Sequence, residues 1–361
     1  MPFKKRELLK KSFVLLIVLY AFLLSINLMG VSFQFFGMDF AKGLFELTSN
    51  PFVGLFVGIL ATSLIQSSSS TTALVVGLVA AGVFDLTSAI PIIMGANVGT
   101  SVTNLLVSLS HSTKNGEFKK AFSVAVVHDI FNMLTLLIIF PLEMAFHLIE
   151  KSAIVVSGFF VSTTASTFTS PISFLVSPVA NWISVELFMK NAIIILIFAL
   201  GILFLSLNVF VRIAKPLAKT ELKDVIHNSL FKSSRRAFIF GIALTAFVQS
   251  SSVTTSLMVP MAAVGLLTIE KIYPYILGAN IGTTITAILA SLATGSPVAL
   301  TVAMAHLIYN IFGIVIFFPL KKIPIFLAQK FTEYAIHSRR YAIVYIFIAF
   351  YVVPFTIIFL F

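Results

Sequence analysis

Long apolar runs restrict what this chain can fold into more than any other feature. The runs Phe13–Gly30, Ala192–Val211 and Tyr341–Phe361 approach or reach the length of about 20 residues that crosses a bilayer. Hydrocarbon offers no partner to backbone N–H and C=O groups, so only helices and closed barrels span a membrane. Barrel strands alternate apolar and polar residues, and these runs do not. The sequence therefore predicts an all-α integral membrane protein.

The charged residues are few and clustered. They make up 10% of the 361 residues, whereas a soluble protein carries about 25%. The net charge of +11 would suggest nucleic acid binding in a soluble protein, but 21 of the 24 Lys and Arg residues fall in five places between apolar spans, at 4–11, 114–120, 212–236, 271 and 321–340. This distribution follows the positive-inside rule. We therefore expect no nucleic acid partner and a cytoplasmic N-terminus. The absence of cysteine excludes disulfides and thiolate metal sites.

The chain also contains an internal duplication. A polar run QSSSSTT recurs as QSSSVTT, and each copy is followed by a GAN-x-GT segment and then by a segment that begins with His and ends with Asn. A proline precedes each GAN-x-GT segment, and another follows each histidine. The paired segments are 66–72 and 249–255, 95–100 and 278–283, and 128–132 and 306–310. So many landmarks in the same order identify two copies of one unit.

The hydropathy pattern gives the two copies opposite polarity. Each polar run interrupts an apolar segment too short for two crossings, which fits a re-entrant helical hairpin. With the expected crossings at 13–30, 88–110, 121–142 and 191–211, the first copy starts outside the cell and the second inside. The result is two inverted-topology repeats, each with a re-entrant helical hairpin, as in secondary transporters.

This reading divides the chain into six parts. The N-terminus resembles a signal peptide, but no clear small-residue cleavage site follows Gly30, so we expect a retained helix. The predicted parts are an N-terminal helix and connector (1–49), repeat 1 (50–143), an external loop (144–190), a helix with a basic cytoplasmic segment (191–236), repeat 2 (237–321) and a C-terminal transmembrane helix (322–361).

The two QSSS tips are the strongest candidates for a ligand site. Hydroxyls can cap broken helix ends, but each tip has more hydroxyl and amide side chains than one cap needs. Each second half-helix also begins with free N–H donors and partial positive charge, which favour a small oxyanion. The tips hold no basic residue, so an anion there would need co-bound cations. Helix capping alone is the alternative interpretation.

The segments that follow the tips favour a monovalent cation. In GAN-x-GT, Asn and Thr offer neutral oxygens that suit Na⁺, whereas Ca²⁺ would need several carboxylates; close packing through small residues is the alternative. Asp129 is the carboxylate that we place deep inside a crossing helix, with no Lys or Arg in the repeat motifs to pair with it. We interpret it as a cation ligand, the alternative being a protonated structural Asp that bonds His128. We expect His128 and His306 to be packing histidines that bond a backbone carbonyl, and Asn132 and Asn310 can also serve as interhelical glue.

Together these motifs resemble the type II sodium–phosphate cotransporter family over about residues 50–320. The resemblance rests on the paired QSSS tips, on PIIMGANVGTSVTN at 91–104 and on VHDIFN at 127–132. It implies an elevator-like secondary transporter that carries inorganic phosphate into the cell with Na⁺, is not an enzyme and uses no cofactor apart from sodium as coupling ion. Electrogenic members of the family carry an acidic residue where Asp129 stands and electroneutral members a glycine, so the resemblance also implies net charge movement.

The resemblance assigns phosphate to the tips and sodium to the helices around them. The predicted phosphate ligands are Gln66, Ser67, Ser68, Ser69, Gln249, Ser250, Ser251 and Ser252. The predicted sodium ligands are Thr72, Asn97, Thr100, Ser101, Asp129, Asn132, Thr255, Asn280, Thr283, Thr284 and Thr286. The lipid bilayer of the cell membrane is the remaining expected partner, and a homodimer is left open.

Some features depart from the animal members. The 144–188 segment is short and lacks the cysteine pair that those members use, and no Asn-x-Ser/Thr glycosylation acceptor is present, which suggests a bacterial member. We weighed three alternatives: an intramembrane serine hydrolase, for which two equivalent sites would serve no purpose, a passive anion channel, and a sodium-coupled transporter of another oxyanion or an exporter of phosphate.

Overall fold

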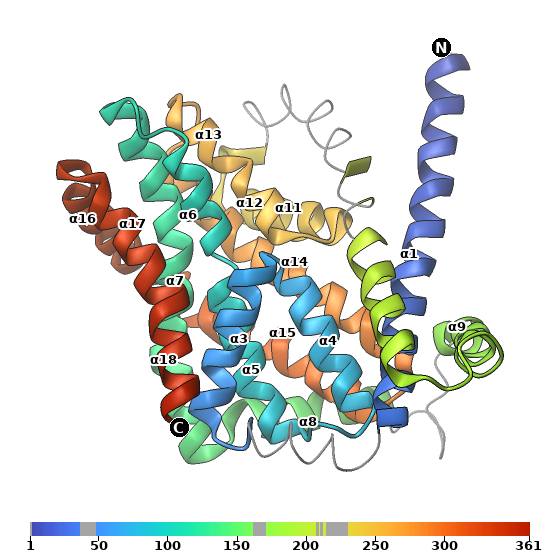
Figure 1. Cartoon of the computed structure of the whole chain (residues 1–361). Coiled ribbons are helices and arrows are strands. Elements are labelled where there is room, and N and C mark those ends of the chain that lie inside the picture. Colours follow the sequence, from blue (N-terminus) through green and yellow to red (C-terminus); the bar gives the residue numbers. More distant parts are fainter. Residues whose placement is uncertain (1, 37–47, 162–170, 207–208, 210–211, 214–229) are drawn as a thin grey trace.

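The chain folds into a helical membrane protein (Figure 1). A computed structural model describes residues 2–36, 48–161, 171–206, 209, 212–213 and 230–361, and every regular element among them is a helix. Six helical segments are long and apolar enough to cross a membrane: Phe13–Phe36, Leu86–Leu109, Asn115–Phe146, Ile269–Thr294, Pro297–Phe317 and Arg339–Leu360. The all-α, multi-pass class predicted from the apolar runs is confirmed.

The first half contains a long N-terminal helix, a hairpin and two further spans. The helices are α1 (Pro2–Phe36), α3 (Pro51–Ile65), α4 (Ser68–Ala80), α5 (Leu86–Gly99), α6 (Val102–Leu109) and α7 (Asn115–Phe146). The hairpin formed by α3 and α4 turns at Gln66 and Ser67. In the span after it, the hydrogen-bond pattern is irregular at Thr100 and Ser101, between α5 and α6, although both residues keep helical φ/ψ. In Figure 1 the hairpin lies in the lower half of the molecule.

The middle of the chain differs from expectation. The segment 144–190 was expected to be an external loop, but it contains α8 (Leu148–Val161), α9 (Pro171–Trp182) and the π-helical turn Ile183–Leu187. Its Ser, Thr and Pro residues are interspersed with enough Ile, Val and Phe to give these helices apolar faces. The predicted helix 191–211 is described as Ala192–Ser206. Most of the basic segment 212–236 lies outside the described residues.

The second half repeats the order of the first. After the turn Leu230–Lys232, its helices are α11 (Ser234–Val248), α12 (Ser251–Ser256), α13 (Met258–Ala263), α14 (Ile269–Thr294) and α15 (Pro297–Phe317). The hairpin formed by α11, α12 and α13 turns at Gln249 and Ser250, and Figure 1 places it in the upper half of the molecule. Helix α14 has no such irregularity and is a single α-helix through its GAN-x-GT segment.

The C-terminal part is more than one helix. The sequence predicted a single transmembrane helix in 322–361, but α16 (Lys322–His337) precedes the span, which itself comprises α17 (Arg339–Phe347), a π-helical turn (Ile348–Val352) and α18 (Val353–Leu360). Helix α16 packs against α7, and α18 packs against α3. The terminal helices therefore cover the first half of the molecule.

Glycines bring each hairpin very close to the helix that follows it. A Cβ atom at Gly58 of α3 would lie 2.0 Å from the Ile92 carbonyl oxygen of α5, and one at Gly241 of α11 would lie 2.1 Å from the Tyr275 carbonyl oxygen of α14. Gly95 and Gly278 make the reciprocal approaches. Because no other side chain fits there, the backbones of α3 and α5, and of α11 and α14, come into direct contact.

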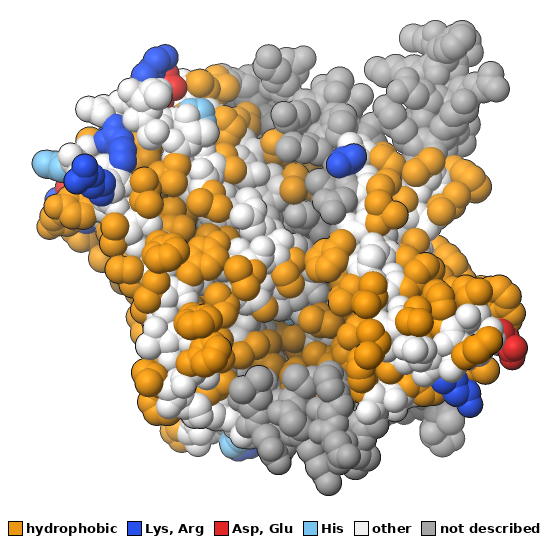
Figure 2. Space-filling view, in the orientation of Figure 1, with side chains coloured by type: hydrophobic (Ala, Val, Ile, Leu, Met, Phe, Trp, Pro, Cys, Tyr) orange, Lys and Arg blue, Asp and Glu red, His pale blue; other side chains and the backbone are white. Residues whose placement is uncertain are grey.

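The surface matches a lipid environment. Figure 2 shows hydrophobic side chains over the middle of one face, with most of its Lys and Arg side chains toward the upper end. Large apolar residues such as Phe159, Ile197 and Phe359 are exposed. A continuous apolar exterior of this kind is what a bilayer requires.

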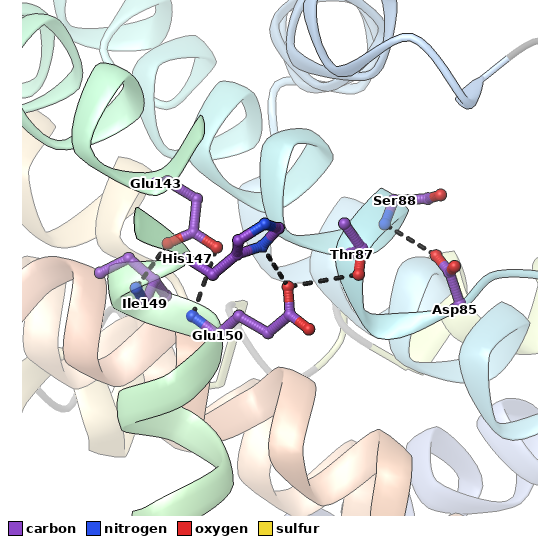
Figure 3. Close-up of polar contacts among 7 residues, drawn as sticks. All are labelled: Asp85, Thr87, Ser88, Glu143, His147, Ile149 and Glu150. Carbon is purple, nitrogen blue, oxygen red and sulfur yellow. Dashed lines mark hydrogen bonds and ion pairs between the residues drawn. The ribbon is translucent and has the colours of Figure 1, made fainter. Parts of the chain in front are cut away.

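A carboxylate cluster joins α7 to α8 (Figure 3). Glu143 is buried, and its carboxylate accepts the N–H groups of Ile149 (2.5 Å) and Glu150 (3.3 Å), which caps the start of α8. Glu150 in turn contacts His147 Nδ1 (3.0 Å) and accepts a hydrogen bond from Thr87 (3.2 Å) at the start of α5. The cluster therefore fixes the angle between α7 and α8 and ties it to α5.

The glycine contacts make a stability prediction. Gly278→Ala places a methyl group 2.0 Å from the Phe238 carbonyl oxygen, so α11 and α14 must separate, and we expect a loss of about 1–3 kcal/mol or more. Gly201→Ala is the control, since its methyl group meets nothing within 4 Å in the helix Ala192–Ser206. Thermal unfolding of the purified protein in detergent measures both; an equal melting temperature for the two variants would contradict the packing described.

Candidate functional site

The two hairpin tips have the same backbone geometry. Gln66 and Gln249 adopt the left-handed conformation, with φ/ψ of 56°/30° and 58°/25°. The next residues, Ser67 and Ser250, are extended, with φ/ψ of −151°/101° and −155°/107°. A left-handed conformation is uncommon for a residue other than glycine. Its occurrence at matching positions shows that the duplicated sequence builds the same turn twice.

A serine begins the second helix of each hairpin. The Ser67 hydroxyl accepts the Ser70 N–H (3.2 Å), and the Ser250 hydroxyl accepts the Val253 N–H (3.4 Å), so both act as N-caps. The first-turn serines, Ser68, Ser69, Ser251 and Ser252, are all buried. Their N–H groups precede the first intrahelical hydrogen bonds and are available to an anion.

The tips touch each other. The Ser69 hydroxyl of the first tip donates a hydrogen bond to the Gln249 carbonyl oxygen of the second, at 3.2 Å. Gln249 is buried, whereas the Gln66 side chain is exposed. The eight predicted phosphate ligands therefore come from two segments that meet inside the protein.

Next to the tips lies a buried cluster of asparagines that links the two halves. Asn97 Nδ2 donates to Asn310 Oδ1 (3.1 Å), and Asn280 Nδ2 donates to Asn132 Oδ1 (2.8 Å). In each pair, the Asn of one GAN-x-GT segment bonds the Asn that follows the histidine in the other half. A second contact joins Asn97 Nδ2 to Asn132 Oδ1 (3.5 Å). The cluster thus crosses the junction between the copies in both directions.

His128 extends this cluster toward the second tip. Its Nε2 lies 2.9 Å from Asn280 Oδ1, and its Nδ1 lies 3.0 Å from Asn104 Nδ2. A neutral imidazole satisfies both amides when Nε2 donates and Nδ1 accepts. Asn104 also bonds Thr255 (2.9 Å), one turn beyond the second tip. The expectation that His128 and His306 bond a backbone carbonyl is wrong: His128 bonds two amides, and neither ring nitrogen of His306 has a partner.

Asp129 is fully buried, and two hydroxyl groups hold it. Ser101 donates to Oδ1 at 2.8 Å, and Tyr345 of α17 donates to Oδ2. The alternative of a bond between Asp129 and His128 is wrong, because neighbouring residues on a helix point in different directions. Among the buried residues that the structure describes there is no Lys or Arg, so no fixed cation neutralises this carboxylate there.

The remaining predicted sodium ligands are buried near the tips and the asparagine cluster. The hydroxyls of Thr72, Thr100, Thr283 and Thr284 donate to carbonyl oxygens of their own helices. The Thr255 hydroxyl donates to Ser251 O at 2.7 Å and accepts a hydrogen bond from Asn104 Nδ2 at 2.9 Å. The Thr286 hydroxyl donates to Gln249 Oε1 at 2.8 Å. Their role as sodium ligands stays a prediction.

Sequence reasoning missed Asn104 and Tyr345. Asn104 ends the run 91–104, but its counterpart in the second copy is Ala287, so comparison of the copies did not select it. Tyr345 belongs to a helix outside the duplication. A polar residue in a strongly apolar helix was the signal available for both.

Comparison with known protein families shows which family the chain belongs to. The Na⁺/Pi-cotransporter family matches residues 21–162 and 202–335, which include both tips and the asparagine cluster. The chain belongs to this family. Membership confirms the resemblance seen in the sequence and makes the protein a member of a family of membrane transporters, not of enzymes.

Individual family members agree with this assignment. The chain is 31% identical to the human sodium-dependent phosphate transport protein 2B, over 95% of this chain and 64% of that protein. It is 31% identical to protein 2A of Rattus norvegicus, over 93% of this chain and 65% of that protein. The chain thus spans slightly less than two thirds of the length of these relatives. No solved structure matches it.

The asparagine cluster predicts an energetic coupling between the two repeated units of this chain. A double-mutant cycle of Asn132→Ala and Asn280→Ala should give a favourable interaction energy of about 0.6–1.7 kcal/mol, typical of hydrogen bonds inside membrane proteins. Unfolding of the parent, both single variants and the double variant in mixed detergent measures it. Pairing Asn280→Ala with Thr301→Ala, a buried residue that bonds Ser157, is the control and should give additive effects. Additivity in both cycles would contradict the cross-junction bond.

Proposed function

We propose that this protein carries inorganic phosphate into the cell together with Na⁺, by alternating access, with phosphate held between the two hairpin tips. The observation that carries the proposal is the contact of two geometrically matched QSSS tips at a buried position. Family membership and the names of the relatives support the choice of phosphate and sodium.

The chemistry of the tips suits a phosphate oxyanion. Their buried hydroxyls donate hydrogen bonds, and the first-turn N–H groups of α4 and α12 add backbone donors and the positive ends of helix dipoles; α12 continues through helical Leu257 into α13. Because no Lys or Arg is buried among the described residues, the charge of the anion needs another counter-charge. Sodium ions that bind with phosphate supply it, which is the physical basis of symport.

Two inverted repeats provide the alternation. The matched tips, the reciprocal glycine contacts and the crossed asparagine pairs support a pseudo-symmetric molecule in which two halves exchange conformations. In this proposal the hairpins are re-entrant and move in an elevator-like manner. The N-terminus lies in the cytoplasm and the protein in the cell membrane, as the basic clusters indicate.

Sodium binds beside the tips in this proposal. Its ligands are the neutral oxygens of the asparagine cluster and of the predicted threonines. Asp129 contributes a carboxylate that exchanges its hydroxyl partners for an additional Na⁺, which makes transport electrogenic.

The proposal predicts sodium-driven phosphate uptake. Proteoliposomes with an inward Na⁺ gradient should accumulate radiolabelled phosphate, and replacement of Na⁺ by K⁺ should abolish the uptake. Sulfate in place of phosphate separates this function from transport of other oxyanions. Uptake that persists in K⁺ would exclude sodium coupling.

The tips should determine phosphate affinity. Ser68→Ala and Ser251→Ala each remove a buried hydroxyl donor, and loss of a hydrogen bond to a charged group weakens binding roughly 10- to 100-fold. Ser291→Ala is the matched control, because this buried serine bonds a carbonyl oxygen of its own helix (2.8 Å). Concentration-dependent uptake measures the effect; unchanged KM in both tip variants would exclude the tips as the phosphate site.

Asp129 should determine voltage dependence. Each net charge moved gains about 2.3 kcal/mol per 100 mV, so Asp129→Gly should reduce or remove the voltage dependence of uptake and retain some transport. Uptake at several imposed K⁺-diffusion potentials, with K⁺ and valinomycin, checks this. Equal voltage dependence in parent and variant would refute the electrogenic role.

A further inference from the structure

The two tips share one backbone geometry but differ in their side-chain bonds. Gln249 follows Gln66 by 183 residues, and the same interval relates Thr245 to Thr62 and Thr286 to Thr103. In the second half, Gln249 is buried and its Oε1 accepts the Thr286 hydroxyl at 2.8 Å. In the first half, Gln66 is exposed, and the buried Thr103 hydroxyl has no partner.

A second pair of threonines differs in the same way. Thr245 and Thr254 of the second half share a hydrogen bond of 2.7 Å. Their counterparts are Thr62 and Thr71. The Thr62 hydroxyl is buried without a partner, and the Thr71 hydroxyl bonds Ser67 O at 3.2 Å.

The first tip lacks the side-chain hydrogen bonds seen at the second, although the helices around both tips pack in the same way. A Cβ atom at Gly99 would lie 2.8 Å from Thr62 Cβ, and one at Gly282 would lie 2.6 Å from Thr245 Cβ, so both threonines pack against the same glycine of the next helix. Thr103 and Thr286 each lie one turn beyond that glycine. The two halves therefore place these threonines equivalently, and they differ in the partners of the side chains, in the exposure of the tip glutamine and in the irregular α5–α6 junction that precedes Thr103.

The other unpartnered buried groups fit this pattern. His306, whose nitrogens have no partner, is the counterpart of the fully bonded His128. Thr135 and Tyr309 also lack partners, but their counterparts, Gly313 and Phe131, have no polar side chain. Hence, among the residues that the structure describes, every unpartnered buried side chain with a polar counterpart matches one that is bonded in the other half. Buried polar groups without partners are rare and call for an explanation.

We propose that Thr286 and Thr103 are equivalent positioning residues for the two tip glutamines and that they are engaged alternately. In the state described here, Thr286 holds Gln249 and Gln66 is released. In the opposite-facing state, Gln66 turns inward onto Thr103, Thr62 pairs with Thr71, and the bond between Gln249 and Thr286 opens. This inference rests on the alternating access proposed above, and it assigns Thr286 to positioning a phosphate-site residue.

Hydrogen exchange detects the exchange of bonds without any substrate. In Na⁺-free, phosphate-free buffer, mass spectrometry of the parent should show slower amide exchange at residues 249–252 than at residues 66–69. Thr286→Val should shift the protection: exchange rises about 10-fold at 249–252 and falls at 66–69, because loss of one bond favours the state that has the other. Adding Thr103→Val should remove the protection from both tips, and Thr286→Ser should keep the parental pattern.

The result separates positioning from a local structural role. If Thr286→Val raises exchange at 249–252 without slowing it at 66–69, or changes neither, the inference is overturned. If Thr286→Val does not fold, Gln249→Met is the second variant, because it also removes the bond between Thr286 and Gln249. It should shift the protection in the same way, and a failure to do so would also overturn the inference. Exchange in α15 away from the tips controls for general loosening. The exchange experiment contains no phosphate. Failure of the parent protein to take up phosphate would therefore contradict the proposed function without affecting the result of the exchange experiment.

Discussion

The interruption of two helices inside an apolar environment is the constraint on which the rest of this structure depends. A broken helix leaves backbone donors and acceptors that hydrocarbon does not satisfy. The left-handed Gln66 and Gln249 end one helix, and the cap serines Ser67 and Ser250 begin the next, so the turn satisfies much of its own backbone. The Ser69 hydroxyl of the first tip bonds the backbone of the second. Glycine contacts pack α3 directly against α5 and α11 directly against α14.

Where the two halves meet, the interior is polar but almost without charge. Amides, hydroxyls and imidazoles connect the halves through bonds such as Asn97–Asn310 and His128–Asn280. Neutral groups of this kind cost less to bury than ions, and each bond can be exchanged for another of similar strength. In the proposed function, such an interior would bind substrate and sodium together for part of the cycle and remain hydrogen-bonded when both have left.

The sequence predicted those features that repetition and hydropathy specify, and it missed those that depend on packing between distant segments. The hairpin tips were predicted because few structures other than a helical hairpin can place a polar run in the middle of a short apolar segment. The helices α8 and α9 were read as a loop because Ser, Thr and Pro obscured their apolar faces. The contact of Tyr345 with Asp129 joins residues 216 positions apart, and no local pattern specifies it. The two GAN-x-GT segments also differ. The hydrogen-bond pattern is irregular at Ser101, which bonds Asp129, whereas α14 is regular, and Leu307 holds the position that corresponds to Asp129.

The bond between Tyr345 and Asp129 has an energetic consequence. Two identical halves would make the two orientations of a transporter equal in free energy, and the empty protein would spend equal time in each. Asp129 has no acidic counterpart, since Leu307 occupies that position, and Tyr345 comes from a helix that was never duplicated. This contact is therefore one of the features that make the two halves unequal. In the proposed alternating-access cycle, it favours one orientation of the empty protein over the other, which the duplication alone could not do.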